Sequence, residues 1–564
     1  MVRSVAPIGP GAPAGPERFD PDAHPEFERF GARYRAEATA GGLTHVEETR
    51  DRSGAVATRV AEPMAYAIGS GTHARSYLFE RDGAVFQSPV TWYSGPGRWD
   101  GSPGYRPDWH FNRPVPADCL FCHANAVEPV EGTVNRYRAP LFRGGAIGCE
   151  RCHGPGALHV SAREAGPAAG EDHTIVNPAR LLPPLREAVC EQCHLAGRVR
   201  VLRDGRGPFD YRPGLPIHLF WSIFEFPGDL EGNVGRVAGH TEQMHASRCY
   251  RASEGRLGCA SCHDPHRKPS AADAPVEFRT ACVKCHAPAA CRGPAAERQA
   301  TRPADNCAGC HMPRSPTPGV GHVALTDHRV LRRPAAAPGA GAGMVLKGAD
   351  TLALFHRGQV ADTDRGVRRD LGLALVTLAR ARTADPAKHQ AAQRHLAGAA
   401  LPLLEEALAR RPGDVAARDA RGGALALLGR PAEALDELAA ALVAAPEREY
   451  TLLAAMTTAG DLGREAEALG FAERAALVNP SSPDALSFLA AARGTAGDWA
   501  GAVAAADAGL RLNPADVQLR TVRIQGYLRT GRADAARADY LLLSRVVSNP
   551  DALLQWFKGA GGTP

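Results

Sequence analysis

The pattern of hydrophobic and polar positions divides the chain into regions of different character. From about Thr44 to Trp99, short runs rich in β-branched and aromatic residues, such as SYLFERDG and AVFQSPVTWY, alternate with Gly and Asp turn signals. This pattern predicts short antiparallel strands, so we expect a small β unit over 44–99. Residues 1–43 begin rich in Pro and Gly and then become charged, which predicts a peripheral N-terminal segment.

The C-terminal region has a helical pattern with an internal repeat. A stretch with the sequence RRPAAAPGAGAG predicts a linker over 332–345, and the chain from 346 to 564 is rich in Ala and Leu. Three sets of positions recur there at intervals of 34 residues: Pro412, Pro446, Pro480 and Pro514; Ala400, Ala434, Ala468, Ala502 and Ala536; Ala407, Ala441, Ala475 and Gly509. A 34-residue period with small residues where two helices cross is typical of tetratricopeptide repeats. We therefore predict about four to five helix pairs that stack into an α-solenoid with a concave groove.

Between the β unit and the linker, the motif CxxCH occurs six times. The copies are Cys119/Cys122/His123, Cys149/Cys152/His153, Cys190/Cys193/His194, Cys259/Cys262/His263, Cys282/Cys285/His286 and Cys307/Cys310/His311. Two thiols at this spacing can form thioethers with the two vinyl groups of one haem, and the adjacent imidazole is then the proximal ligand of the iron. Zinc is the alternative, because paired CxxC motifs also form zinc ribbons. Zinc does not require a histidine after every second cysteine, so the motifs predict six haem c groups.

The segment with the motifs, 119–311, contains many Gly and Pro residues and few long periodic helices. Such a segment cannot build a conventional side-chain core, so we expect the apolar faces of the porphyrins to supply it. The predicted fold is therefore mainly α with a small β unit. A haem-packed cytochrome c domain with little regular structure, over 44–331, precedes the repeat solenoid over 346–564.

Composition excludes some classes of protein and leaves others open. The chain is 44% hydrophobic and has a formal net charge of +5, without the stripe of basic and aromatic residues typical of nucleic-acid binding. No apolar run approaches the roughly 18 residues that a transmembrane segment needs. Haem is attached to CxxCH outside the cytoplasm, although the first twenty residues show no apolar signal-peptide core. We expect a periplasmic or otherwise extracytoplasmic protein whose signal peptide is not visible in this chain.

Function depends on the distal ligand of each iron. His159 follows His153 by six residues and His266 follows His263 by three, which is too close for either to reach the far face of its own haem. We expect each to bind the iron of a neighbouring haem, which would hold haems in close pairs. The other distal candidates are His73, His240, His245, His322 and His328, with Met244 as a competing ligand. We favour His110, His173 and His218 less and His24 and His45 least, and we expect His356, His389 and His395 at the surface.

Two cysteines, Cys249 and Cys291, lie outside the motifs. In an oxidising compartment they could form a disulfide, and the alternative is two unpaired buried thiols.

Taken together, GCERCHGPGALH, VCEQCHLAGR, LGCASCHDPH, NCAGCHMP and LTDHRV, with IGSGTHARSYL upstream and the repeats downstream, resemble a family of bacterial multihaem c-type cytochromes. The haem core is similar to the small tetrahaem cytochrome that accepts electrons from hydroxylamine oxidoreductase. The resemblance implies mainly bis-histidine haems, with His159, His266 and His328 as distal ligands. Members usually carry a further CxxCH near the N-terminus, and the first hundred residues here contain no cysteine.

Three functions remain possible from the sequence. The leading interpretation is electron transfer through six haems to and from redox partner proteins, with the repeats docking a protein partner. The second is an oxidoreductase that acts on small nitrogen or sulfur compounds at one haem with an open distal position. The third is a scaffold in which the repeat groove binds a partner and the haems are secondary.

Overall fold

The computed structural model divides into two compact units, 1–147 with 375–564 and 148–374. It describes residues 4–9, 15–19, 25–39, 42–107, 109–167, 170–226, 239–287, 291–301, 305–317, 320–332, 352–381 and 386–564. Helix α10 (Arg365–Arg380) contains the point at which the chain passes from the second unit back to the first. None of the described helices is long and apolar enough to cross a membrane.

The first unit begins with two antiparallel sheets. One sheet has the strand order β1-β6-β7-β8-β10, with β9 paired to β8, and the other has the order β2-β3-β4-β5. The strands are β1 (Val5–Pro7), β2 (Phe27–Arg29), β3 (Ala32–Thr39), β4 (Gly42–Arg50), β5 (Val56–Pro63), β6 (Tyr66–Ile68), β7 (Ala74–Arg81), β8 (Ala84–Tyr93), β9 (Arg98–Gly101) and β10 (Arg113–Pro114). Alternating aromatic side chains of β7 and β8, including Tyr77, Phe79, Phe86 and Trp92, form their shared core. The β unit expected over 44–99 is therefore present but larger.

Residues 1–43 differ from the peripheral segment expected from their composition. Strand β3 pairs with β4 from Ala32 opposite Thr49 to Thr39 opposite Gly42, and β1 pairs Val5 with Ile68. The charged side chains of β3 obscure its strand pattern, because they form ion pairs across the sheet such as Arg35 with Glu48. Residues 1–43 enter the sheets because their strands pair with strands elsewhere in the chain. Composition alone does not reveal such partners.

The other part of the first unit is a series of antiparallel helical hairpins. Its helices are α11 (Pro386–Arg410), α12 (Val415–Leu427), α13 (Pro431–Ala444), α14 (Glu449–Asp461), α15 (Glu465–Val478), α16 (Pro483–Thr495), α17 (Trp499–Leu512), α18 (Val517–Arg529), α19 (Ala533–Val546) and α20 (Pro550–Gly559). The predicted small residues Ala434, Ala468, Ala502 and Ala536 are all buried. Each hairpin from α12 to α19 turns at a glycine with positive φ, at Gly429, Gly463, Gly497 and Gly531, which repeat the 34-residue interval. The hairpins are therefore of the tetratricopeptide type.

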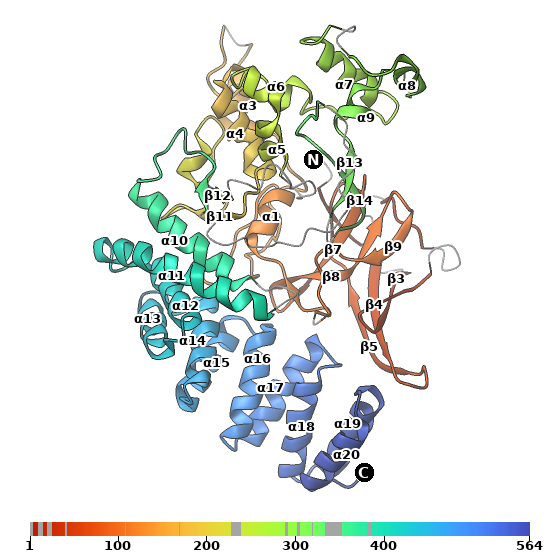
Figure 1. Ribbon diagram of the computed structural model, residues 1–564. Helices are drawn as coiled ribbons and strands as arrows, with labels where there is room; N and C mark the ends of the chain where they lie inside the picture. The colour runs from red at the N-terminus through yellow and green to blue at the C-terminus, as the bar shows by residue number, and fades with distance from the viewer. Residues whose placement is uncertain are drawn as a thin grey trace. The chain divides into compact units, whose positions relative to one another are not determined.

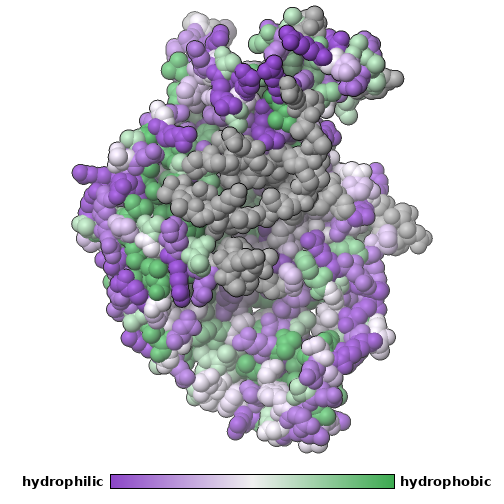
Figure 2. Space-filling view, viewed as in Figure 1, coloured by the Kyte–Doolittle hydropathy of each residue, from purple (hydrophilic) through white to green (hydrophobic). Residues whose placement is uncertain are grey.

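The repeats and the β unit are in contact within this first unit. The last hairpin lies beside β5 in Figure 1, and Arg545 of α19 forms an ion pair with Asp51, which follows β4. The described residues on the face shown in Figure 2 are mainly hydrophilic with scattered hydrophobic patches.

The second unit has short helices and little sheet. Its elements are α2 (Glu150–His153), α3 (Ala157–Glu164), η1 (Pro178–Arg180), α4 (Pro183–His194), β11 (Val199–Leu202), η2 (Ile217–Leu219), β12 (Trp221–Glu225), α5 (His240–Ala246), α6 (Arg248–Ala252), η4 (Cys259–Ser261), α7 (Ala274–Val283), α8 (Ala295–Ala300), α9 (Cys307–His311), β13 (Arg314–Thr317), β14 (Val320–Thr326) and β15 (Ala353–Leu354). From Cys259 to Arg314, no described residue is buried. The helical segments η4, α7, α8 and α9 thus contain no buried side chain. The haem-packed core expected for this segment remains a prediction.

Most of the predicted linker, from 333 onward, lies outside the described residues. The chain after it does not start the repeats directly. Strand β15 pairs with β12, with Leu354 opposite Phe224, and Asp370 of α10 accepts a hydrogen bond of 2.7 Å from Ser222 Oγ. The second unit therefore extends to residue 374, beyond the start expected for the repeat domain at 346.

Candidate haem-binding sites

Each CxxCH motif lies on or next to a short helix. The first is on α1 (Ala117–His123) of the first unit, and the others are on α2, α4, η4, the end of α7 and α9 of the second. In one helical turn, positions i, i+3 and i+4 share a face. The two thiols and the imidazole of a motif are therefore presented together, as attachment of one haem requires.

Two motif histidines face a predicted distal histidine at the spacing of a shared iron. The ring centres of His153 and His266 lie 5.9 Å apart, with 18° between the ring planes. Those of His263 and His328 lie 6.3 Å apart, at 31°. Two imidazoles on opposite sides of one metal ion, each bound at about 2 Å, have ring centres about 6 Å apart. Both pairs therefore fit a bis-histidine haem, and in the first pair a histidine beside motif four reaches motif two.

A third motif histidine, His194, lies next to His240. Their ring centres are 5.1 Å apart and their Nδ1 atoms 3.3 Å apart. Burial, followed by the neighbouring His328, His194 and His263, lowers the pKa of His240 from 6.5 to about 3. A neutral imidazole is the form that binds iron. The structure thus brings His240, rather than His245, to a motif histidine.

The outer nitrogen of several of these rings is held by the backbone. Nδ1 of His153 lies 2.8 Å from the carbonyl oxygen of Val176, and Nδ1 of His311 lies 2.6 Å from that of Leu331. Nδ1 of His328 lies 2.9 Å from the carbonyl oxygen of Thr326. Metal-bound histidines commonly donate their second N–H in this way, which fixes the ring and directs Nε2 to the metal. The donor set therefore fits haem iron.

The cysteines of neighbouring motifs meet in two places. A hydrogen bond with the thiol of Cys259 lowers the pKa of Cys190, which connects motifs three and four. Burial, followed by an interaction with Cys307, raises the pKa of Cys282 to about 11, which connects motifs five and six. The attachment points of these motifs are therefore close in space.

The structure also locates five further motif residues: the second cysteine of four motifs and the histidine of motif five. It does not confirm their predicted roles. Cys122 and Cys193 are half-buried, whereas Cys285, Cys310 and His286 are exposed. The backbone N–H of His286 closes the last turn of motif five with a hydrogen bond of 3.0 Å. Exposure and a closed turn permit haem attachment without demonstrating it. The thioethers of these four cysteines and the proximal role of His286 therefore remain predictions, as do the roles of all the other motif cysteines and histidines.

For the remaining distal candidates, the structure does not show a motif histidine at the spacing of a shared iron among the described contacts. Nδ1 of His159 lies 2.9 Å from Asp172 Oδ2, an arrangement that would orient its ring toward a metal. His73 is exposed in the loop before β7, in the same unit as the motif that contains His123. His322 lies in β14, but its side chain is outside the described part of the structure, as is the whole of His24. Their roles as distal ligands remain predictions.

Cys249 and Cys291 are free thiols in the structure, and the disulfide between them remains one of the two predicted alternatives. Cys249 instead lies near the motif cysteines Cys262 and Cys282, whose pKa values it contributes to raising.

The structure also corrects one expectation and reveals residues that the sequence patterns missed. His356, expected at the surface, is buried, and its Nε2 lies 3.1 Å from Glu191 Oε2. His245 Nε2 lies 3.0 Å from Glu187 Oε2. The spacing of Glu187 and Glu191, four residues apart on α4, was the only available signal. His395 is exposed as expected, and the side chain of His389 lies outside the described residues.

Comparison with known proteins adds little to this geometry. No protein-family model matches the chain, and no curated protein matches it. A crystal structure of MamA is 15% identical over 32% of this chain and 91% of its own, with a TM-score of 0.27. YrrB, described as a tetratricopeptide protein with an unusual peptide-binding site, is 16% identical over 33% of this chain and 92% of its own, with a TM-score of 0.29. At such TM-scores the likeness is too weak to indicate a function or a partner.

Proposed function

We propose that this protein is an extracytoplasmic electron carrier with six covalently bound c-type haems. The observation that carries the proposal is a set of two histidine pairs in the second unit whose ring centres are about 6 Å apart. In each pair, a motif histidine faces a histidine from another part of the chain: His153 with His266 and His263 with His328.

The contacts between motifs would place the haems close to one another, and closely spaced haems can pass electrons between them. His266 follows motif four by three residues and faces the histidine of motif two. If it binds that iron, three residues of backbone connect two haems. The contacts of Cys190 with Cys259 and of Cys282 with Cys307 support the same spacing for two further pairs. Bound haem would supply one-electron chemistry, and the chain would set its potential through axial ligands and burial.

The test is electron paramagnetic resonance of the oxidised holo-protein, with carbon monoxide added to the reduced form. Expression in a host that matures c-type cytochromes should give six haems per chain by pyridine haemochrome assay. We expect low-spin signals and no carbon monoxide adduct. A high-spin haem that binds carbon monoxide would overturn a pure carrier and favour the oxidoreductase. Zinc in place of haem would overturn both.

A second candidate function, a protein-binding scaffold, is favoured by an observation on the repeats. Val443 and Leu477 occupy equivalent positions on α13 and α15, and their exposed fractions are 86% and 80%. Large apolar side chains this exposed at repeat-equivalent positions offer a surface for a protein partner. We propose that the repeats bind a partner protein, either a redox partner or a cargo, through this surface.

The scaffold proposal is tested with point substitutions that leave the repeats intact. Val443→Asp and Leu477→Asp remove the apolar surface, and Arg511→Ser, at the equivalent position one repeat later, is the control. Proteins that cross-link to the wild type in periplasmic extract should be lost from both Asp variants and kept by the control. Identical cross-linked proteins from all four would contradict this surface. An unchanged haem spectrum would show that the substitutions had spared the other unit.

A further inference from the structure

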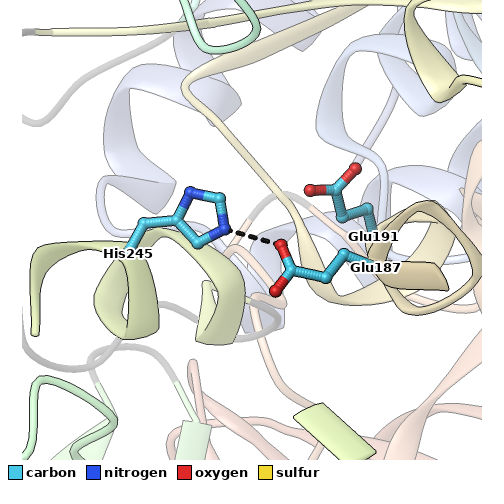
Figure 3. A group of neighbouring side chains, drawn as sticks. All are labelled: Glu187, Glu191 and His245. Carbon is cyan, nitrogen blue, oxygen red and sulfur yellow. Dashed lines mark hydrogen bonds and ion pairs between the residues drawn. The ribbon is translucent and has the colours of Figure 1, made fainter. Parts of the chain in front are cut away.

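A cluster of buried carboxylates and histidines lies beside the third haem motif, in the second unit. Glu187 and Glu191 are four residues apart on α4, so they share one face of the helix, and each is at least nine-tenths buried. His245 comes from α5 and faces Glu187, as Figure 3 shows. One potential ligand atom from each of the three residues lies within 4.8 Å of the others. The sequence resemblance assigns no role to either glutamate.

The hydrogen bonds within this cluster leave polar atoms without partners. Glu187 Oε2 lies 3.0 Å from His245 Nε2, but Glu187 Oε1 is buried with no hydrogen-bond partner among the described residues. Glu191 Oε2 lies 3.1 Å from Nε2 of His356, whose Nδ1 is also buried and has no partner in the described part of the chain. A buried carboxylate oxygen without a partner is costly, and so is a second buried carboxylate beside it. The cluster therefore lacks a positive group that both glutamates can share.

Aromatic rings enclose the same cluster. The ring of Tyr250 stacks on His245 with a centre separation of 4.0 Å, and its hydroxyl donates to Glu187 Oε2 at 3.4 Å. Phe355 lies 5.1 Å from His245 and 5.0 Å from His356, between ring centres. The two glutamates are buried beside these rings, while 24% of the His245 side chain stays exposed. Burial strengthens the electrostatic interactions of the carboxylates.

We infer that Glu187, Glu191 and His245 bind a divalent transition-metal ion, separate from the haem irons. Two carboxylates and an imidazole are a ligand set that suits Zn²⁺ or Mn²⁺, and a divalent charge compensates both glutamates at once. Glu187 Oε1 gains a partner when its carboxylate binds the ion. His356 is a positioning residue, because its Nε2 orients the Glu191 carboxylate.

The alternative is a pair of histidine–glutamate ion pairs with no metal. Neutral imidazoles could donate through Nε2–H but would leave both carboxylate charges uncompensated, so ion pairs require each imidazole to carry a second proton. His356 would then bury an N–H donor at Nδ1, where the structure offers no acceptor among the described residues. The same ion pairs would still leave Glu187 Oε1 without a hydrogen-bond partner among the residues that the structure describes.

The experiment uses the holo-protein, in which the motif cysteines are held as thioethers and cannot bind zinc. Holo-protein is treated with a chelator, incubated with Zn²⁺, desalted and measured by elemental mass spectrometry. We expect about one zinc per chain in the wild type, with affinity at least tenfold weaker in Glu187→Gln and Glu191→Gln. Glu277→Gln, on α7, where the partly exposed Glu277 pairs with Arg267, is the matched control and should bind zinc as the wild type does.

The wild-type measurement stands even if a variant fails to fold, and the haem spectrum reports folding of each variant. Less than about a tenth of a zinc per chain in the wild type would overturn the proposal in favour of two ion pairs. Equal binding by the wild type and both glutamine variants would also overturn it, because the zinc would then lie elsewhere. Repeating the titration with Mn²⁺ identifies which ion the site prefers.

Discussion

The side-chain amide of Asn479, in the turn between α15 and α16, donates a hydrogen bond of 3.0 Å to Asn135 Oδ1, and both residues are buried. The Nδ2 of Asn479 also donates to Glu449 Oε1 at 2.9 Å. Glu449 in turn accepts from the backbone N–H of Val134 at 2.9 Å, and Arg136 donates to the carbonyl oxygen of Val478. The repeats are thus joined to the segment that follows the first haem motif, by buried polar contacts that position both.

We predict that Asn479→Asp weakens this contact. Aspartate keeps the acceptor that receives the Ser481 N–H at 3.2 Å, but it removes both Nδ2 hydrogen bonds and adds a charge next to Glu449. The expected loss is about 2 kcal/mol, because buried partners are left unsatisfied. Hydrogen exchange of peptides around 130–137 should become faster in the variant.

The control for this prediction comes from the repeat itself. Asn513 stands at the equivalent position one repeat later, where its Oδ1 accepts from the Ala515 N–H at 3.1 Å. Asn513→Asp therefore keeps the same turn and should leave exchange near 130–137 unchanged. Equal exchange in both variants would show that the contact between Asn479 and Asn135 does not stabilise the unit.

The contrast between these asparagines shows what the sequence could reveal. Local patterns are sufficient for the repeats, because the 34-residue columns place small residues at helix crossings and glycines at turns. They are sufficient for the CxxCH motifs too, since each is contiguous. The contact of Asn135 with Asn479 joins residues far apart in the chain. Asn513, which occupies the equivalent position of the next repeat, does not form such a contact in the described structure. The burial of His356 and the pairing of β1 with β6 have the same origin: a distant partner that no local pattern names.

The same arrangement of four charged residues occurs twice in the repeats, three repeats apart. At the equivalent positions of the two repeats between them, Glu473 is charged and the other residues are apolar. The first cluster is Glu405, Arg418, Arg421 and Glu437, and the second is Asp507, Arg520, Arg523 and Asp539. The two differ in burial. Side-chain exposure is 7% for Arg520 and 8% for Asp539, but 25% for Arg418 and 16% for Glu437.

We predict that Asp539→Asn destabilises the repeats far more than Glu437→Gln. Asp539 accepts from Arg520 and from Arg523 at 2.6 Å each, so its loss leaves a buried guanidinium without its counter-ion. Breaking such a buried pair costs about 3 kcal/mol. The pair of Glu437 with Arg418 is closer to solvent, and ion pairs contribute less as they become exposed, down to about 1 kcal/mol or less at the surface. Urea unfolding followed by far-ultraviolet circular dichroism measures both. Similar midpoints for the two variants would contradict the assigned role of burial.

The β unit should lose stability in mild acid because of His45. This residue of β4 is fully buried, its Nδ1 lies 2.7 Å from Ser88 Oγ, and its ring packs edge-on against Tyr77 and Trp99. Burial lowers its pKa from 6.5 to about 3. In the unfolded chain His45 therefore binds a proton below about pH 6.5, whereas in the folded chain it stays neutral down to about pH 3. Stability is full above pH 6.5 and falls as the pH drops toward 3, by at most about 1.4 kcal/mol per pH unit.

Hydrogen exchange of β4 and β5 peptides between pH 7.5 and 5, corrected for intrinsic rates, measures this loss. His45→Asn keeps a donor near Ser88 without titrating, so its opening free energy should change less with pH. His395→Asn, at an exposed position of α11, should retain the wild-type dependence. A pH dependence that His45→Asn does not alter would assign the effect to another group.

The pairing of His153 with His266 makes a spectroscopic prediction. His266 is the more accessible partner, with 75% of its side chain exposed and its Nδ1 3.7 Å from Asp264 Oδ1, so its replacement should disturb little else. In His266→Ala, the iron bound by His153 should lose its distal ligand and become high-spin, while the other haems stay low-spin. One haem per chain should then bind carbon monoxide in the reduced protein. His173→Ala, an exposed histidine of the same unit, should leave all haems low-spin. Should His266→Ala remain wholly low-spin, another residue must bind that iron, and the bridge between motifs two and four would be wrong.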